Sequence, residues 1–336
     1  MNSAPSLIGL AALAALTSTS AVAQSSVTAY GRLDVAVEQV RITGGGVAGR
    51  TIRLLSNDGS RLGFRGTEDL GDGFRAMFNI EAALSPDTGT ASSTAFWGRQ
   101  SWVGIGSEKW GDILLGRNYA PIDDDAWYFD AFQYGGNNAT YGVQKYQARV
   151  DNSIKYVSPK FAGAQVRLLT NVENPTGVGK LYGGNISYFA GPFAAKFGLN
   201  NVKIAGPAGR LDTRNDVLLG VSYNFKVVKT SVAYFQRKDP GVDTYKSVVA
   251  GVNVPIGELG DVRANVGRIT QVTLKSSIFG VGYWYFLSKR TSLYTAYANQ
   301  SNGAGSRLEA FALPTFTSIG VDQRASSFQA GIRHNF

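Results

Sequence analysis

The sequence predicts an all-β protein, a 16-stranded antiparallel β-barrel that crosses a membrane. Three observations lead to this prediction. Apolar and polar residues alternate with a period of two in one segment after another, compact turns alternate with longer links, and the chain ends on an aromatic residue of an amphipathic strand. Period-two alternation places apolar side chains on one face of a strand and polar side chains on the other.

The alternation recurs along most of the chain. In 74–84, Phe74 and Ile80 share one face, whereas Arg75 and Glu81 share the opposite face. Because the charged residues keep to one parity, we expect a polar lumen and an apolar wall that meets lipid. Comparable segments are 27–38, 164–173, 182–189, 193–200, 217–225, 228–237, 262–269, 278–287, 292–299 and 326–336.

The connections between these segments set the number of strands. Seven compact turns and eight longer polar links make fifteen connections, which implies sixteen strands with both termini at one end. Outer-membrane barrels of bacteria have an even number of strands, short periplasmic turns and long outer loops. Closure is required because an unpaired sheet edge is costly in lipid. The longer links are 39–58, 85–94, 118–148, 174–181, 201–214, 238–243, 270–276 and 300–323.

Composition argues against other classes of protein. No run of 18 apolar residues occurs after the N-terminus, which excludes membrane-spanning helices. The formal net charge is +9, but the basic residues are scattered rather than clustered, so nucleic acid is not an expected partner. The single histidine, His334, has no evident Ser or Asp partner, and we expect no enzyme activity, no metal site and no cofactor.

Residues 1–24 resemble a secretory signal peptide. An apolar run over 7–16 is followed by Ala21-Val22-Ala23, a small-x-small pattern that is typical of a cleavage site. No Lys or Arg precedes the apolar run, which is atypical of such signals. We expect residues 25–336 to form one exported barrel domain.

The link over about 118–148 is the candidate functional element. It carries the acidic run Asp123, Asp124 and Asp125 together with several aromatic residues. Such a loop is too apolar to lie free in water and too acidic for a hydrophobic core. A water-filled barrel interior satisfies both demands, so we expect this third long loop to fold inward and narrow the lumen. The three aspartates could instead form a cation site or simply be solvated.

Several motifs together resemble the trimeric general porins of the β-proteobacterial Gram-negative porin family. They are SSVTAYGRLD (25–34), SRLGFRGTEDLGDGFRAMFNIE (60–81), FWGRQSWVGI (96–105), WGDILLGRNYAP (110–121), RVDNSIKYVSPKFAG (149–163), LSKRTSLY (287–294) and GIRHNF (331–336). The resemblance implies a homotrimer in the outer membrane of a Gram-negative bacterium, with the third loop as a pore constriction. It also implies an arginine cluster and one acidic partner, at Arg61, Arg99, Arg149 and Glu81.

Strand parity extends this set. Arg65 shares a parity with Arg61, and Arg75 shares the lumen parity of Glu81, so both join the predicted constriction. Alternatively, each is an ordinary solvated lumen residue with an ion-pair partner. A further set that is predicted to share one parity is Arg149, Asp151 and Lys155.

These observations predict a passive diffusion channel for small hydrophilic solutes and ions. Three arginines and a basic total favour anions, since Arg and Lys rings in pores attract anions, although the acidic run could reverse this preference. The alternatives are a solute-specific porin for an organic acid or sugar, in which the aromatics of 127–134 form a stacking track, and a plugged structural barrel. Expected partners are outer-membrane lipid, lipopolysaccharide and the barrel-assembly machinery, for which the terminal Phe336 is the expected signal.

Overall fold

A computed structural model describes residues 26–336 except 58, 92, 94, 134–145, 173–176 and 309–318. The expected signal peptide, residues 1–24, lies outside the described residues. The described chain is almost entirely β-strand, with two short 3₁₀ helices, η1 (Ala126–Phe129) and η2 (Pro207–Gly209). Within these described ranges, no helix has the length and apolar character that a membrane crossing requires.

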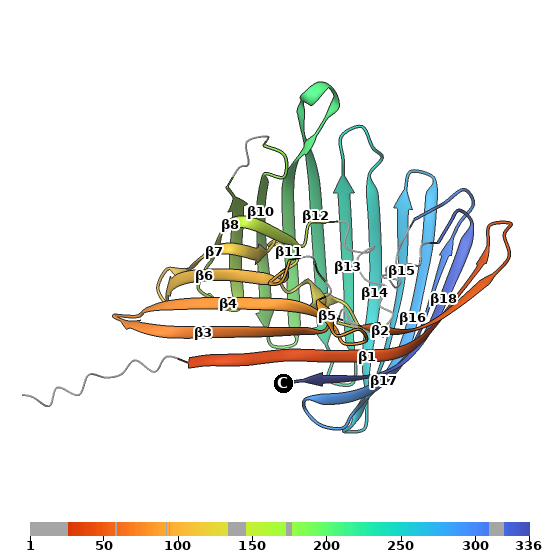
Figure 1. The fold of residues 1–336 in the computed structure, drawn as a ribbon, viewed down its shortest axis with the longest axis horizontal. Coiled ribbons are helices and arrows are strands. Elements are labelled where there is room, and N and C mark those ends of the chain that lie inside the picture. Colours follow the sequence, from red (N-terminus) through yellow and green to blue (C-terminus); the bar gives the residue numbers. More distant parts are fainter. Residues whose placement is uncertain are drawn as a thin grey trace, which may run out of the picture.

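The strands form one closed antiparallel barrel with sixteen strand positions around the wall, as predicted (Figure 1). β2 and β3 both pair with the same edge of β1 and together fill one of these positions. β5 pairs only with the end of β4, in an outer hairpin, and is not counted among the sixteen. The strands are β1 (Ser26–Gly44), β2 (Arg50–Asn57), β3 (Arg61–Gly71), β4 (Phe74–Ser85), β5 (Thr90–Ala91), β6 (Gln100–Ser107), β7 (Gly111–Tyr119), β8 (Arg149–Val157), β9 (Ala164–Asn171), β10 (Leu181–Ala190), β11 (Phe193–Ala205), β12 (Leu211–Asn224), β13 (Lys229–Lys238), β14 (Tyr245–Ile256), β15 (Gly260–Gln271), β16 (Leu274–Phe286), β17 (Thr291–Asn302) and β18 (Gln323–Asn335).

The two ends of the chain close the barrel. β1 pairs with β18 from Arg32↔Asn335 to Gly44↔Gln323, and its other edge pairs with β2 and β3. Every strand of the barrel wall therefore has a hydrogen-bonded neighbour on both sides, as a sheet in a lipid bilayer requires. In Figure 1, β1, β3 and β4 lie side by side in the order that this pairing requires.

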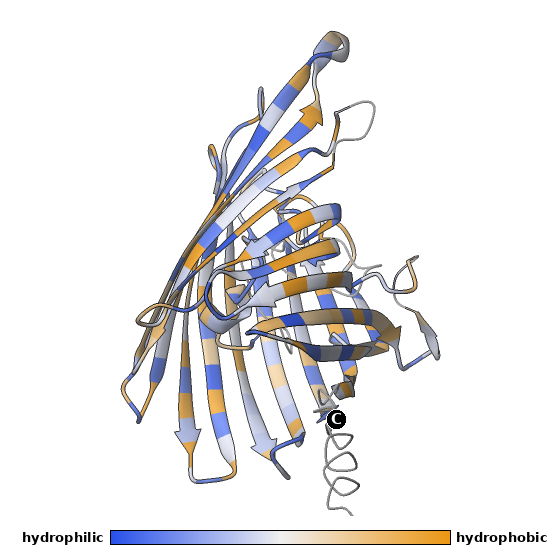
Figure 2. Ribbon diagram, turned by 90° about the vertical axis from the view of Figure 1, so that its left-hand side faces the viewer, coloured by the Kyte–Doolittle hydropathy of each residue, from blue (hydrophilic) through white to orange (hydrophobic). Residues whose placement is uncertain are grey.

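The two faces of the wall differ as the alternation predicts. On β1, the outward Val37 is 64% exposed and its neighbour Glu38, which points inward, is 1% exposed. Figure 2 shows apolar and polar bands alternating along the strands. A barrel of sixteen strands is too wide for its own side chains to fill. Inward residues therefore contact either water or chain that folds into the lumen.

Three of the predicted long links are shorter than expected. The link 39–58 is mostly strand, because β1 continues to Gly44 and β2 begins at Arg50. β11 and β12 likewise take up most of 201–214, and β15 and β16 take up most of 270–276. The alternation of apolar residues ends where the lipid ends, but the backbone ladder continues above it. The loss of the apolar pattern was therefore mistaken for the end of the strand, while the number of connections was predicted correctly.

The C-terminal residue completes the seam between β1 and the end of the chain. The Gly31 N–H donates to the Phe336 carbonyl at 3.0 Å, and the Phe336 N–H donates to the Gly31 carbonyl at 3.2 Å. A Cβ atom at position 31 would clash with the Phe336 ring, so glycine is needed at this approach. Phe336 thus contributes both backbone pairing and ring packing to closure.

Deleting Phe336 is expected to lower the yield of folded barrel. Two backbone hydrogen bonds are lost, a destabilisation of about 2 kcal/mol at about 1 kcal/mol each. The folded fraction after refolding into detergent can be measured by electrophoresis of heated and unheated samples. Phe328→Ala is a matched control, because Phe328 lies on β18 and faces outward, and its truncation leaves the backbone pairing with Gln39 of β1 in place. Equal yields of the deletion variant and the wild type would contradict a role for Phe336 in assembly.

Candidate functional site

Glu81 on β4 is the centre of a cluster of lumen side chains. Its carboxylate is 5% exposed and forms ion pairs with Arg61, at 3.6 Å between Nε and Oε2, and with Arg99 through Oε1. The Tyr30 hydroxyl lies 2.8 Å from the Asn79 amide oxygen and 3.0 Å from Oε2, and its single proton can be donated to either acceptor. Strands β1, β3 and β4 and the residue before β6 thus bring two arginines to one carboxylate.

Tyr119 connects the third arginine to this cluster. Its hydroxyl oxygen accepts from Arg99 Nη2 at 2.8 Å and from Arg149 Nη2 at 3.3 Å. The Arg149 guanidinium also lies over the Tyr119 ring, 4.8 Å from its centroid. A phenol oxygen has two lone pairs, so it can accept both bonds. The structure therefore brings together Arg61, Arg99 and Arg149, of which Arg61 and Arg99 pair with Glu81 and Arg149 is joined to Arg99 by Tyr119.

Of the other two predicted arginines, Arg65 borders this cluster through Tyr30 and Arg75 lies apart from it. Arg65 is exposed, and its guanidinium carbon lies 5.1 Å from the centroid of the Tyr30 ring. On β3, Arg65 is the next inward-facing residue after Gly63 in the direction of the short turns. Arg75 forms an ion pair with Asp112 of β7. It lies six residues from Glu81 along β4, about 20 Å at the usual rise per residue. Arg75 therefore belongs to the short-turn end of the barrel.

The acidic run attaches the third loop to the adjoining wall at β8 and β9. Asp124 pairs with Lys155 of β8 at 2.6 Å, and Asp125 pairs with Arg167 of β9 at 2.6 Å. Asp123 accepts a hydrogen bond from the Tyr146 hydroxyl at 2.7 Å within the loop. Burial raises the pKa of the Asp123 carboxyl, and the Tyr146 hydrogen bond opposes this rise. The carboxylates of Asp124 and Asp125 are thus held by wall cations rather than left to face the arginine cluster.

Wall side chains also hold the loop backbone. Lys196 Nζ donates to the Pro121 carbonyl at 3.1 Å, and Lys229 Nζ donates to the Tyr128 carbonyl at 3.0 Å. Asn253 Nδ2 donates to the Ala131 carbonyl at 2.7 Å. These bonds come from β11, β13 and β14 in the order in which the loop passes them. The loop therefore folds inward and follows the inner wall, as predicted.

A row of glycines makes room for the loop against the wall. A Cβ at Gly198 would lie 3.2 Å from Ile122 Cα, and one at Gly220 would lie 2.5 Å from the Phe129 ring. A Cβ at Gly251 would lie 2.8 Å from the Ala131 Cβ. The row continues on β10, where a Cβ at Gly183 would lie 3.0 Å from Pro121 Cδ. Without side chains at these positions, the loop can pack directly on the sheet.

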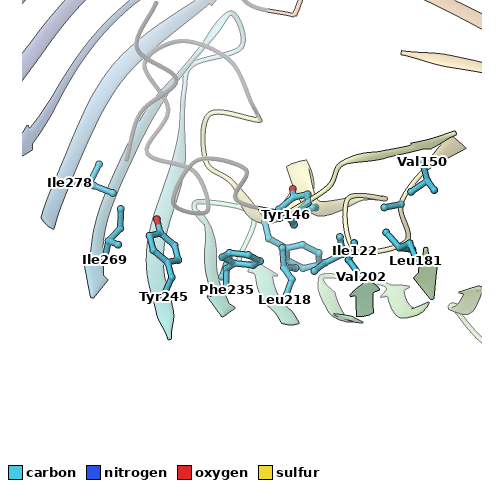
Figure 3. Packing of buried hydrophobic residues seen from close by; sticks show 14 of the residues in the cluster. Ile122, Tyr146, Val150, Leu181, Val202, Leu218, Phe235, Tyr245, Ile269 and Ile278 are labelled. Carbon is cyan, nitrogen blue, oxygen red and sulfur yellow. The ribbon is translucent and has the colours of Figure 1, made fainter. Parts of the chain in front are cut away.

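Apolar contacts also hold the loop against the inner wall. Figure 3 shows Ile122 and Tyr146 of the loop among inward residues such as Leu218 and Phe235. Further along, the Phe132 ring meets the Trp284 ring edge-on with centroids 5.5 Å apart. These loop–wall contacts were not predicted from the sequence. Their signal was available, since apolar residues and glycines interrupt the polar parity of β9–β16 at Leu218, Gly220, Phe235 and Gly251.

The predicted shared parity of Arg149, Asp151 and Lys155 is wrong. Arg149 and Lys155 face inward, but Asp151 pairs with Arg117 and its side chain is 68% exposed. The register shifts between Gly116 and Asn118, and Asn152 has a φ of 50°. A bulge of this kind changes which residues face each side, and period-two counting cannot detect it.

The double substitution D124N/D125N is expected to loosen the loop. It leaves Lys155 and Arg167 without their carboxylates, and removing one partner of a buried pair costs about 3–5 kcal/mol before discounting for partial exposure. In planar bilayers we expect more frequent current fluctuations. D112N is a matched control, because Asp112 pairs with Arg75 of β4 at the short-turn end of the barrel. Single-channel traces as quiet as those of the wild type would contradict the anchoring role.

Comparison with known proteins identifies the class. The family model described as Gram-negative porin matches residues 9–305. The chain belongs to this family. It is an outer-membrane porin.

Relatives cover the porin over nearly its full length. "Outer membrane porin protein 32" of Delftia acidovorans is 33% identical over 98% of this chain and 99% of its own. A Bordetella pertussis outer-membrane porin protein is 28% identical over 97% of this chain and 98% of its own. Among solved structures, an anion-selective porin from Comamonas acidovorans superposes with a TM-score of 0.80 at 29% identity, covering 93% of this chain and 100% of its own.

Proposed function

We propose that this porin is a passive diffusion channel for small hydrophilic solutes that prefers anions, with its constriction between the arginine cluster and the third loop. The observation that carries the proposal is the balance of charge. Arg61 and Arg99 pair with one carboxylate, Glu81, and Tyr119 joins Arg149 to Arg99, whereas the loop acids Asp124 and Asp125 are each held by a wall cation. The cluster therefore keeps a net positive charge.

Electrostatics turns this balance into a preference. Arg and Lys side chains that line a pore attract anions, and low-dielectric walls focus the field of fixed charges. Tyr119 supports the geometry, because it holds the guanidinium groups of Arg99 and Arg149 close together despite their repulsion. The similar porin from Comamonas acidovorans is described as anion-selective, which agrees with the proposal.

The packing of aromatic residues favours a general channel over a solute-specific one. A stacking track needs ring faces that a solute can reach. Phe129 is 1% exposed and Phe132 is 0% exposed, since both pack on the wall. Tyr128 is half-buried and Trp127 is 43% exposed. The predicted track also included residue 134, which lies outside the described residues.

The zero-current potential in a KCl gradient across a planar bilayer tests the preference. We expect a sign that shows chloride to be more permeant than potassium, and a larger effect at low salt because screening is weaker. Titration with a sugar and with an organic acid tests whether the channel is general or solute-specific. We expect no saturable block of the ion current by either solute. A potassium preference would contradict the proposed selectivity, and saturable block would replace the general channel with a specific one.

We further infer a homotrimer. Arg117 and Asp151 form an ion pair on the outward side of β7 and β8, among the exposed apolar residues Leu115 and Ile154. Charged groups facing lipid are costly, whereas a contact with a second subunit can accommodate them. Native mass spectrometry in detergent should give three times the chain mass, and a monomer that remains folded would contradict the inference.

A further inference from the structure

Three inward glycines lie directly beneath the third loop. They are Gly198 of β11, Gly220 of β12 and Gly251 of β14, and they are called here the loop-bearing glycines. For each of them, the atom nearest to an added Cβ belongs to the loop. The inward Gly267 of β15 differs, because the atoms nearest to its added Cβ belong to wall residues of β14 and β16. Contact with the loop is therefore a property of these positions and not of every glycine on the inner wall.

The backbone at these three positions does not itself require glycine. None of the three has a φ in the left-handed region, so a residue with a side chain can adopt the same strand conformation. Glycine in the interior of a strand weakens the strand, and it often marks the close approach of another segment of backbone. What lies on these glycines therefore explains them better than their own conformation does.

The loop atoms above two of these glycines cannot turn aside. At Gly198 the nearest atom is the Cα of Ile122, 3.2 Å from an added Cβ. At Gly251 the nearest atom is the Cβ of Ala131, 2.8 Å away. Neither a main-chain atom nor the methyl group of alanine can move to another rotamer. A side chain at either position would therefore displace the loop itself.

The ring above the third glycine is equally confined. A Cβ at Gly220 would lie 2.5 Å from the Phe129 ring, which is 1% exposed. The centroid of this ring is 5.6 Å from that of Tyr128 and 6.3 Å from that of Phe189. A ring packed on three sides cannot rotate without moving its neighbours. A side chain at position 220 would also displace the loop.

Hydrogen bonds draw the loop against the wall beside the same glycines. Asn253 Nδ2 donates to the Ala131 carbonyl at 2.7 Å, two residues along β14 from Gly251. Lys229 Nζ donates to the Tyr128 carbonyl at 3.0 Å. These donors hold the loop down, and the bare backbone of the loop-bearing glycines sets how close to the wall it can come. The depth of the loop thus follows from side chains that the wall lacks.

Strand order places these glycines across the lumen from the arginine cluster. β12 is eight strand positions from the position that β2 and β3 fill, and β14 is eight positions from β6. Eight of sixteen positions is half of the circumference. Arg61 lies on β3 and Arg99 directly precedes β6, so the loop over Gly220 and Gly251 faces these two arginines. A displacement of the loop away from its wall is therefore a displacement toward the arginine cluster.

We propose that the loop-bearing glycines set the width of the pore and hence the largest solute that passes. This inference rests on the proposed constriction between the arginine cluster and the third loop. Carbon atoms pack at about 3.5–4.0 Å, so a methyl group at position 251 displaces the loop by about 1 Å. Barrel geometry leaves about 12 Å between the loop layer and the facing side chains. A displacement of about 1 Å thus removes about a tenth of the width.

A methyl group moved from the loop to the wall tests the proposal in the full-length porin. G251A should lower single-channel conductance in concentrated KCl by about a tenth, and the largest polyethylene glycol that enters the channel should be smaller. A131G removes the methyl group that the new side chain meets, so G251A/A131G should recover the conductance and the size limit of the wild type. G267A is the matched control, because it adds the same methyl group to the inner wall where no loop atom lies nearest, and it should match the wild type.

Side chains of other sizes and positions should give graded effects. G251V reaches about 1.5 Å further from the wall than G251A, so it should lower conductance by about a fifth. G198A places its Cβ farther from the loop, at 3.2 Å from the main chain, so its effect should be smaller than that of G251A. It makes the same test if G251A does not fold. Electrophoresis of heated and unheated samples measures the folded fraction of each variant.

The outcomes separate this inference from the proposed constriction. Replacing residues 121–147 by a short turn removes the loop, and unchanged conductance in that variant would contradict the constriction itself. If that replacement raises conductance while folded G251A conducts like the wild type, the glycines do not set the width. A reduced conductance of G251A that A131G does not restore would also overturn the inference, since the reduction would then come from the strand and not from contact with the loop.

Discussion

Replacing Arg61, Arg99 and Arg149 together by Gln is expected to change the preference of the channel from anions to cations. The wild-type cluster holds three positive charges and one negative charge, and the variant keeps only Glu81. At about 5 Å and an effective dielectric constant near 40, one fixed charge is worth roughly 1.7 kcal/mol to a passing ion. Salt screening over a Debye length of about 8 Å reduces this value.

The net change should be on the order of 1 kcal/mol, about a fivefold change in the permeability ratio. The measurement is the zero-current potential of wild type and variant in KCl gradients at low and high salt. An unchanged ratio at low salt would show that these arginines do not control ion passage.

Two control variants make the arginine result specific. R61K/R99K/R149K keeps the charges but removes the planar donors, so the anion preference should persist. R75Q removes a lumen arginine that is paired with Asp112 and lies away from the cluster, so its ratio should match the wild type. A potassium preference in R75Q of the size seen in the triple variant would mean that total lumen charge, rather than this cluster, determines selectivity.

Replacing residues 121–147 by an Asn-Gly turn is expected to widen the channel. The ends of this segment are already close, because the Ala120 N–H donates to the Ala148 carbonyl at 2.9 Å. A short turn can therefore join β7 to β8 without distorting either strand. The variant loses the loop contacts with Lys196, Lys229 and Asn253 but no pairing between strands of the barrel wall.

Barrel geometry gives the size of the effect. Sixteen strands about 4.8 Å apart and tilted by about 40° make a wall roughly 32 Å across. Inward side chains of about 5 Å on each side leave roughly 22 Å, and a packed layer of chain takes about 10 Å of that width. Removing the loop should raise single-channel conductance roughly two- to threefold and admit larger sugars in liposome swelling. Unchanged conductance in a correctly folded variant would show that the loop does not limit the pore.

A milder variant separates loop position from loop presence. F129A/F132A removes the two rings that pack on the wall near Gly220 and Trp284 but keeps the loop. We expect intermediate conductance with larger fluctuations. A conductance equal to that of the full replacement would indicate that these two rings alone hold the loop in place.

The sequence by itself determined the architecture of this porin. Period-two alternation is a local property, and a residue such as Val37 or Glu38 carries its direction in its own chemistry. Counting the turns then predicted sixteen strands, because each turn is marked by residues that interrupt the pairing of β-strands. The inward third loop was predictable for a similar reason, because its mixture of aspartates and aromatics suits no other place.

Only the tertiary structure decided what the charged residues contact. Asp124 and Asp125 meet Lys155 and Arg167, more than thirty residues away along the chain, and strand pairing alone sets those distances. Arg75 and Glu81 share a parity but lie about 20 Å apart along one strand. Parity therefore predicted that both side chains face the lumen, but not how far apart they lie along the barrel axis. A single bulge beside Asn152 turned Asp151 outward. Where strand pairing is regular, the sequence determines whether a side chain faces the lumen or the lipid. Its position along the barrel axis and its contacts depend on strand register, which is established only when neighbouring strands pair.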